Sequence, residues 1–209
     1  MKIKICFIIP SLRAGGAERV MSFIAENIDS DRFTSQLLVI ESEENKSYEI
    51  VQIPVIFLNK TRVRDGILQI ISFIHKNNIE IVVSAISHVN SVMAFVSILF
   101  PKVKFVGRET IVKSAMAKVR KNSPKPSILS RLIVKVQASK LDAIICQSED
   151  MRYDLKENYG YPAEKLVVLN NPITSNFRLK IKKNNNFQDF IVSLCMYGDT
   201  CHHPYIFFR

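Results

Sequence analysis

The first 28 residues constrain the fold more than any other stretch of this chain. Residues 3–9 are nearly all apolar, as in a buried strand, and a short turn with the adjacent Gly15 and Gly16 leads into an amphipathic helical pattern. The start of a helix exposes unpaired N–H groups and a partial positive charge, and glycines without Cβ atoms let a ligand approach the backbone. The unit therefore predicts an anion-binding turn and indicates a phosphate-bearing substrate.

Strand and helix patterns alternate along the chain. The apolar runs at 3–9, 80–85 and 142–147 are nearly continuous, as expected when both faces of a parallel sheet are covered. Strands are expected at 3–9, 34–40, 54–58, 80–85, 103–107, 142–147 and 166–169, and helices at 16–28, 64–77, 90–100, 127–140 and 149–158. This alternation predicts an α/β fold with a Rossmann-like, doubly wound parallel sheet. Ligands of such sheets bind beyond the carboxyl ends of the strands, so the site is expected in loops 10–16, 41–49, 86–90, 108–126 and 170–176.

The net charge of +10 is concentrated in one part of the sequence. Residues 101–140 contain eleven lysines and arginines, and their only acidic residue is Glu109. Within 108–126, one helical side is apolar (Ile111, Val112, Ala115, Met116 and Val119), and the rest carries Lys113, Lys118, Arg120 and Lys121. This pattern favours contact of the basic segment 102–140 with an anionic membrane surface, and a solvated loop is the alternative. Nucleic acid is not an expected partner, because Phe105 is the one aromatic residue available there for stacking.

The remaining composition indicates a cytoplasmic protein without a membrane span. Cys6 and Cys146 lie in apolar runs and are expected to be buried thiols of a reducing compartment. The apolar run that begins at Val92 ends at Phe100, far short of the roughly 20 residues that a membrane span needs. No metal site is predicted, because the spacing of the late cysteines and histidines matches no familiar ligand pattern; these are Cys195, Cys201, His202 and His203.

Four segments of the sequence together carry a family resemblance. The first is residues 10–20, the glycine-containing turn and helix start. The second is residues 83–90, a strand followed by a polar loop. The third is residues 106–109, the end of another strand. The fourth joins residues 142–148 to residues 167–173. Together these segments resemble the N-terminal, acceptor-side domain of GT-B glycosyltransferases of family 4, and the resemblance spans residues 1 to about 176.

This resemblance implies a set of site residues. Ser11, Gly15 and Gly16 would bind the substrate or the donor diphosphate, and Arg108 and Glu109, after a later strand, would bind acceptor hydroxyls or phosphate. His88 would contact the transferred sugar or the acceptor, and is the candidate catalytic residue. The alternatives without a role in binding are a plain tight turn at the glycines, a polar loop histidine at position 88, and a surface ion pair between Arg108 and Glu109. A dinucleotide site with Glu41 as ribose ligand is disfavoured, because the turn lacks G-x-G-x-x-G.

The family implies transfer of a hexosyl group from a nucleotide sugar to a saccharide or lipid-linked acceptor, as in polysaccharide biosynthesis, without a metal or other cofactor. Its members continue into a second Rossmann-like domain that binds the donor. Here we expect a domain at 1–185 and an atypical tail at 186–209, which predicts a truncated, inactive chain. Two alternatives stay open: a non-catalytic module that pairs with a separately encoded donor-binding half, and a non-functional remnant.

Overall fold

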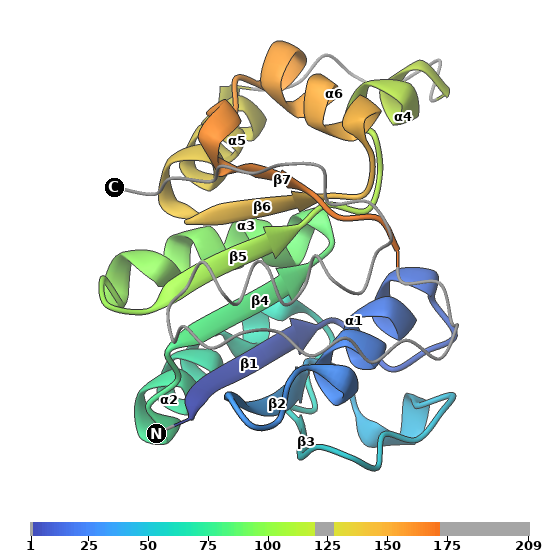
Figure 1. Cartoon of the computed structure of the whole chain (residues 1–209), viewed down its shortest axis with the longest axis vertical. Coiled ribbons are helices and arrows are strands. Elements are labelled where there is room, and N and C mark those ends of the chain that lie inside the picture. Colours follow the sequence, from blue (N-terminus) through green and yellow to red (C-terminus); the bar gives the residue numbers. More distant parts are fainter. Residues whose placement is uncertain (1, 120–127, 172–209) are drawn as a thin grey trace.

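The fold is built on one sheet of parallel strands, which lie side by side from β3 at the bottom to β7 at the top of Figure 1. The computed structural model describes residues 2–119 and 128–171, with the side chains of 2–116 and 128–171. Within this part the sheet has seven strands in the order β3-β2-β1-β4-β5-β6-β7, and every neighbouring pair is parallel. The strands are β1 (Ile3–Ile9), β2 (Phe33–Val39), β3 (Val55–Phe57), β4 (Ile81–Ala85), β5 (Lys104–Arg108), β6 (Ala143–Cys146) and β7 (Leu166–Val168).

The helices connect successive strands. The α-helices are α1 (Gly16–Asn27), α2 (Ile67–Asn77), α3 (Ser87–Val96), α4 (Lys113–Val119), α5 (Ile128–Lys140) and α6 (Glu149–Tyr159). Short 3₁₀ turns are η1 (Glu43–Asn45), η2 (Val63–Gly66), η3 (Ser97–Leu99) and η4 (Ala163–Lys165). The predicted α/β, Rossmann-like parallel sheet is confirmed.

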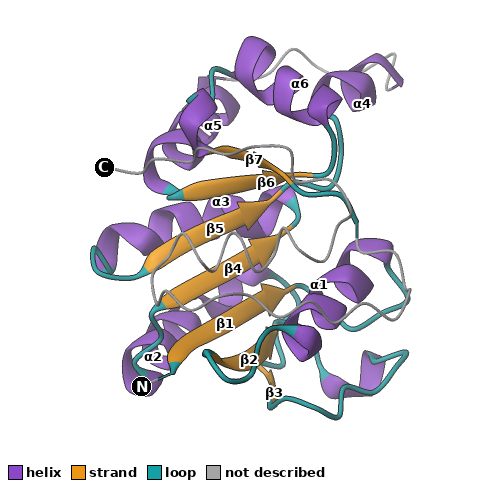
Figure 2. Ribbon diagram, viewed as in Figure 1, coloured by secondary structure: helices purple, strands orange, loops and turns teal. Residues whose placement is uncertain are grey.

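Two apolar layers cover the two faces of the sheet. On one face, Met21 and Ala25 of α1 pack against alternate side chains of the strands, including Phe7 and Val83. On the other face, α2, α3, α5 and α6 contribute to a second cluster around Phe105. Figure 2 shows α1 on the near side of the strands and α2 and α3 on the far side. Burial on both faces explains why the central strands are almost continuously apolar in sequence.

The strand order reverses between β1 and β4, which lie side by side although β2 and β3 come between them in the chain. In open parallel sheets, ligands bind beyond the carboxyl ends of the strands at such a switch point. The segments that leave β1 and β4 there are the turn with Gly15 and Gly16 and the start of α3 with His88. The topology thus brings together two of the segments that the sequence analysis selected.

One predicted boundary is wrong in a way that affects the site. The helix expected at 90–100 begins at Ser87 and continues through Val96 into η3. The chain turns sharply at Ile86, which has φ 73° and ψ 133°. A β-branched residue rarely adopts a positive φ, so its sequence gives no turn signal. His88, expected in a polar loop, is therefore in the first turn of α3.

No helix among the described residues is long and apolar enough to cross a membrane. The predicted domain at 1–185 contains the whole of the sheet described above. The predicted tail at 186–209 lies outside the described residues.

Candidate functional site

The start of α1 is open at one glycine and covered at the other. Gly15 is the N-cap, with φ −85° and ψ 144°, and no side chain caps the helix by a hydrogen bond. A Cβ added at Gly15 would lie 2.1 Å from Oε2 of Glu18, so the carboxylate of Glu18 lies over this residue. A Cβ added at Gly16 would meet no atom within 4 Å. The amides at the start of α1 are therefore approachable at Gly16, while Glu18 places a negative charge where the helix dipole favours one.

The turn before α1 is tied to the neighbouring strand. The guanidinium of Arg13 forms an ion pair with the carboxylate of Glu41, which follows β2, and Glu41 N–H donates to the Pro10 carbonyl at 3.0 Å. Ser11 is buried at the end of β1. Glu41, which would have been the ribose ligand of a dinucleotide site, thus has a partner of its own.

His88 lies in the first turn of α3 and is exposed. The turn is fixed by Ile86: its N–H donates to the Arg108 carbonyl at 3.2 Å, and its carbonyl accepts from the N–H groups of Val89 and Asn90 at 3.0 Å each. An outlying backbone conformation held by such contacts is a feature often found at functional sites. These contacts fix the backbone of the first turn of α3, which carries the exposed His88, next to the end of β5.

Arg108 and Glu109 end β5 but reach different partners. Both are buried, at 2% and 3% exposure, so the alternative of a surface ion pair between them is wrong. Arg108 donates from Nη2 to Oδ1 of Asn171, which lies beyond β7. Glu109 accepts from Nδ2 of Asn90 at 3.4 Å and pairs with Lys113, Nζ to Oε1 3.3 Å. Successive residues of an extended chain point in opposite directions, which explains the separation.

Asn90 is a central residue of the site to which the sequence analysis gave no role. It is 1% exposed, accepts from the Ser84 hydroxyl at 2.8 Å, and donates to the Arg108 carbonyl at 3.1 Å and to Glu109. It also lies beside Gly107, where an added Cβ would be 3.2 Å from Asn90 Cγ. A polar residue on an otherwise apolar helical stripe, after Val89 and before Met93, was the available signal.

Lys113 also differs from the expectation that it lies on the solvated side of its helix. Its ammonium is directed inward to Glu109 and lies 5.5 Å and 5.4 Å from the ring centroids of Tyr159 and Tyr161. The basic residues of 102–140 that are exposed among the described side chains are Lys102, Lys104, Arg131, Lys135 and Lys140. Four others, Lys118, Arg120, Lys121 and Lys125, lie outside the described side chains.

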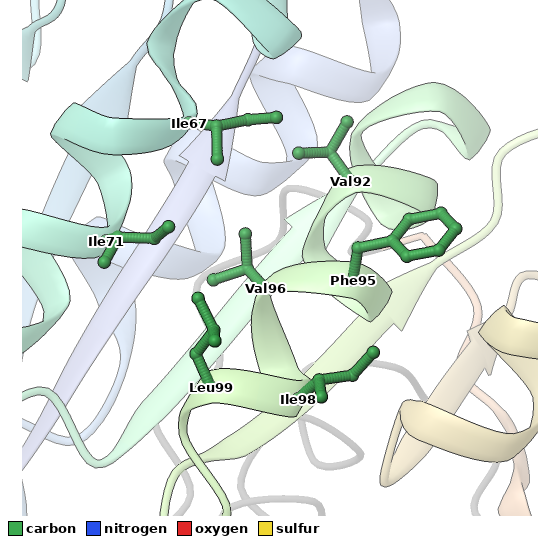
Figure 3. A pocket seen from close by; sticks show the side chains of 7 residues that line it. All are labelled: Ile67, Ile71, Val92, Phe95, Val96, Ile98 and Leu99. Atoms are coloured by element: carbon green, nitrogen blue, oxygen red, sulfur yellow. The ribbon is translucent and has the colours of Figure 1, made fainter.

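An apolar groove of about 410 Å³ lies away from this site, on the outer surface of α2 and α3. Figure 3 shows Ile67 and Ile71 of α2 facing Val92 and Val96 of α3. Phe95, Ile98 and Leu99 complete the lining. With no polar group in its lining, the groove has no means of orienting a phosphate or a sugar.

In the described part of the chain, no group of three or more His, Cys, Asp or Glu side chains is placed to hold a metal ion. Cys195, Cys201, His202 and His203 lie outside it.

Comparison with known proteins extends this picture. The family model described as Glycosyltransferase Family 4 matches residues 14–177. A search of curated proteins finds no match. Among solved structures, HepE from Anabaena, in complex with UDP, is 17% identical with a TM-score of 0.56, and the match covers 82% of this chain and 44% of HepE.

Two further structures show how widely the fold is shared. The lipopolysaccharide outer core galactosyltransferase WaaB is 14% identical, with a TM-score of 0.59 over 82% of this chain and 46% of WaaB. UDP-GlcNAc 2-epimerase from Neisseria meningitidis, bound to UDP-GlcNAc, is 13% identical, with a TM-score of 0.57 over 82% of this chain and 46% of the epimerase. This chain thus spans less than half the length of these structures. The fold alone is common to a galactosyltransferase and an epimerase, whereas the family match covers Gly15, Gly16, His88, Arg108 and Glu109 of the candidate site.

Proposed function

Because the chain belongs to glycosyltransferase family 4, we propose that it supplies the acceptor-side half of an enzyme that transfers a hexosyl group from a nucleotide sugar to a saccharide or lipid-linked acceptor. The observation that carries the proposal is the open start of α1 at Gly16, at the point where the strand order reverses. Helix N-termini with accessible amides stabilise phosphate groups. HepE, which shares this fold, was solved with UDP.

The residues have separate roles in this proposal. Ser11, Gly15 and Gly16 form the turn that binds the donor diphosphate, with Gly16 as its open side, and the amides at the α1 start stabilise the charge that develops on the diphosphate as the glycosidic bond to the sugar breaks. Such stabilisation by dipoles that are already in position is a major source of catalysis. His88 contacts the transferred sugar or the acceptor. Arg108 lies on the acceptor side, and Glu109 supports this side through Asn90 and Lys113. No metal or other cofactor takes part.

Donor affinity in this family resides mainly in the second domain, so we expect the 209-residue chain to show no sugar transfer by itself. A donor-binding domain added to this one would complete the two-lobed site. Detectable transfer from a nucleotide sugar by the purified chain would contradict the expected inactivity.

We further infer a peripheral location at the inner, cytoplasmic face of a membrane, in a role in glycan or polysaccharide biosynthesis. The support is the start of α5, where Ile128, Leu129 and Leu132 are 88%, 66% and 54% exposed. Arg131 and Lys135 are exposed on the same helix. Apolar side chains beside cations suit an anionic bilayer surface. Cys6 and Cys146 are free, buried thiols, in keeping with a reducing compartment.

The proposed diphosphate site is tested by UDP binding to the purified chain. In a titration followed by NMR, UDP should shift the backbone amide resonances of residues 15–18. Because only one half of the site is present, we expect a dissociation constant in the millimolar range, which corresponds to a binding free energy of roughly −4 kcal/mol. Gly16→Val should remove the shifts because its side chain fills the open approach. Ala14→Val, at an exposed residue of the same turn, is the control. Unchanged binding by Gly16→Val would contradict the proposed site.

A further inference from the structure

Arg108 holds a buried positive charge that its surroundings only partly satisfy. The side chain is 2% exposed, although guanidinium groups are almost always solvated or paired. Nη2 donates to the neutral amide oxygen of Asn171. Nη1 is buried and has no hydrogen-bond partner among the described residues. A cation whose Nη2 has a neutral partner and whose Nη1 is unpaired lacks the counter-charge that usually accompanies burial.

The neighbouring carboxylate does not supply that charge. Glu109 is committed to Lys113 and Asn90, and no ion pair joins Arg108 to any acidic residue in the described part of the chain. Burial lowers the pKa of Arg108 to about 10, so the group stays charged at neutral pH. An incoming oxyanion would therefore meet a desolvated, fully charged donor.

The backbone around Arg108 fixes it in place. Its carbonyl accepts from Ile86 N–H at 3.2 Å and from Nδ2 of Asn90 at 3.1 Å, which locks the end of β5 to the start of α3. The partner of its side chain, Asn171, comes from beyond β7 and contributes no charge. Exchange of a neutral amide oxygen for an anionic oxygen strengthens the contact, because charge-assisted hydrogen bonds to a guanidinium are roughly twice as strong as neutral ones.

The position along the sheet separates this group from the diphosphate site. β4 lies between β1 and β5, so the end of β5 is about 10 Å along the edge from the end of β1, at two strand spacings. The exposed His88 is in the helix that follows β4. With the diphosphate at the end of β1, the transferred sugar would lie beyond the end of β4. Arg108, at the end of β5, would then lie on the side of the sugar away from the diphosphate, where an acceptor would bind.

We propose, on the basis of the proposed function, that Arg108 binds an anionic group of the acceptor, a phosphate or a carboxylate, and so selects acidic acceptors, with Asn171 displaced from the guanidinium when they bind. The planar fork of a guanidinium can donate two parallel hydrogen bonds to either oxyanion. Arg108 is then the specificity-determining residue of the acceptor side.

The test compares three probes on the purified 209-residue chain: glycerol 3-phosphate, glucuronate and glucose. We expect at least one acidic probe to bind, and its affinity to fall at least tenfold in Arg108→Gln, while glucose shows no difference between the two proteins. The control is Arg64→Gln, which removes the same charge at a side chain that is 67% exposed. UDP should bind the wild type and Arg108→Gln within a factor of two.

Each other outcome counts against the proposal in a distinct way. Equal binding of the acidic probes to wild type and Arg108→Gln, or no binding of either acid, would overturn it and leave the diphosphate site standing. A parallel loss of UDP affinity in Arg108→Gln would assign Arg108 to the donor and overturn the acceptor role. UDP that fails to bind the wild type, with Arg108-dependent binding of an acid intact, would contradict the diphosphate site instead. If Arg108→Gln does not fold, Arg108→Met serves: the acidic probe should raise the melting temperature of the wild type but not of this variant.

Discussion

Lys113 and Glu109 form a buried ion pair, with 3.3 Å between Nζ and Oε1 and side chains that are 15% and 4% exposed. The pair is part of a chain of polar contacts behind the candidate site. The ammonium lies 3.4 Å from the Tyr161 hydroxyl, which donates to Oε1 of Gln137 at 2.8 Å. Gln137 in turn donates to the Ser87 carbonyl at 3.0 Å. The first turn of α3 is thus held both through Glu109 and Asn90 and through Gln137.

Lys113→Met should destabilise the protein by about 3 kcal/mol, because it leaves the Glu109 carboxylate buried without its counter-charge. Urea unfolding followed by circular dichroism measures the change. The control is Lys46→Met, which removes a lysine that pairs with Glu43 and Glu49 on the surface and should change stability far less. Equal losses in the two variants would show that the buried pair contributes no more than a surface pair.

Asp154→Asn should loosen α4, because the Asp154 carboxylate accepts from Ser114 N–H at 3.1 Å and from Asn158 Nδ2 at 2.8 Å. Loss of these charge-assisted bonds should cost about 1.5–3 kcal/mol at pH 7. Faster hydrogen exchange at the Ser114 amide would report the loosening. An unchanged exchange rate there would contradict the assigned role.

The same carboxylate gives a pH dependence with a definite sign. Burial by itself would raise the pKa of Asp154, but the hydrogen bonds from Ser114 and Asn158 outweigh it, and the pKa is lowered from its usual 3.8. A lowered pKa in the folded state means that the stabilisation is complete above pH 4 and is lost as the pH falls through the folded-state pKa. The stability difference between wild type and Asp154→Asn should therefore be constant from pH 5 to 7 and shrink below pH 4. Unfolding curves across this range test it, and a difference that grows on acidification would refute it.

Glu18→Gln should raise the affinity for UDP several-fold. The carboxylate of Glu18 lies over Gly15, at the positive end of the α1 dipole. A diphosphate that binds there must meet this charge, and the uncharged amide removes the repulsion while keeping the shape. The NMR titration described above gives the ratio of dissociation constants, with Glu26→Gln near the other end of α1 as the control. Weaker binding by Glu18→Gln would indicate that Glu18 assists the ligand instead of competing with it.

Features that depend on contacts between residues close in sequence could be predicted here, whereas features that depend on contacts between distant residues could not. Seven strands were expected and seven are found in the described part, each within two residues of the predicted ends, because an apolar run is a local property. The Ser148 cap of α6 was also predictable, since a capping hydroxyl acts within one turn; Met151 N–H donates to it at 3.2 Å. Arg108 and Glu109 were selected because they follow a strand.

What the sequence did not reveal depends on residues that meet only after folding. Nothing local to Asn90 indicates that it joins Ser84 to Glu109 across two strands. The sequence pattern predicts a solvated position for Lys113. Helical periodicity shows which residues share a side of the helix, but it does not show which side is buried when apolar and basic residues are mixed. The positive φ of Ile86 opposes the preference of its side chain, and it is held by the backbone contacts with Arg108, Val89 and Asn90.

His88→Ala, made at the equivalent position of a full-length homologue, should lower turnover and leave stability within about 0.5 kcal/mol, because the histidine is an exposed residue of α3. The turnover number kcat and the urea midpoint are the two measurements. Unchanged turnover would dismiss His88 as a site residue. A large loss of stability would make it a structural residue of the α3 start.

Membrane contact should depend on the start of α5 and on salt. The chain should co-sediment with vesicles of anionic lipid but not with neutral ones, and less so at high ionic strength. At about 1 kcal/mol for each basic residue near an anionic surface, the double change Arg131→Gln and Lys135→Gln should lower the partition coefficient roughly thirtyfold. Leu132→Ser should lower it further, whereas Leu68→Ser, at an 81% exposed leucine of α2, should not. Equal partitioning into both kinds of vesicle would exclude an electrostatic membrane surface, and equal effects of the two leucine changes would exclude α5 as the contact.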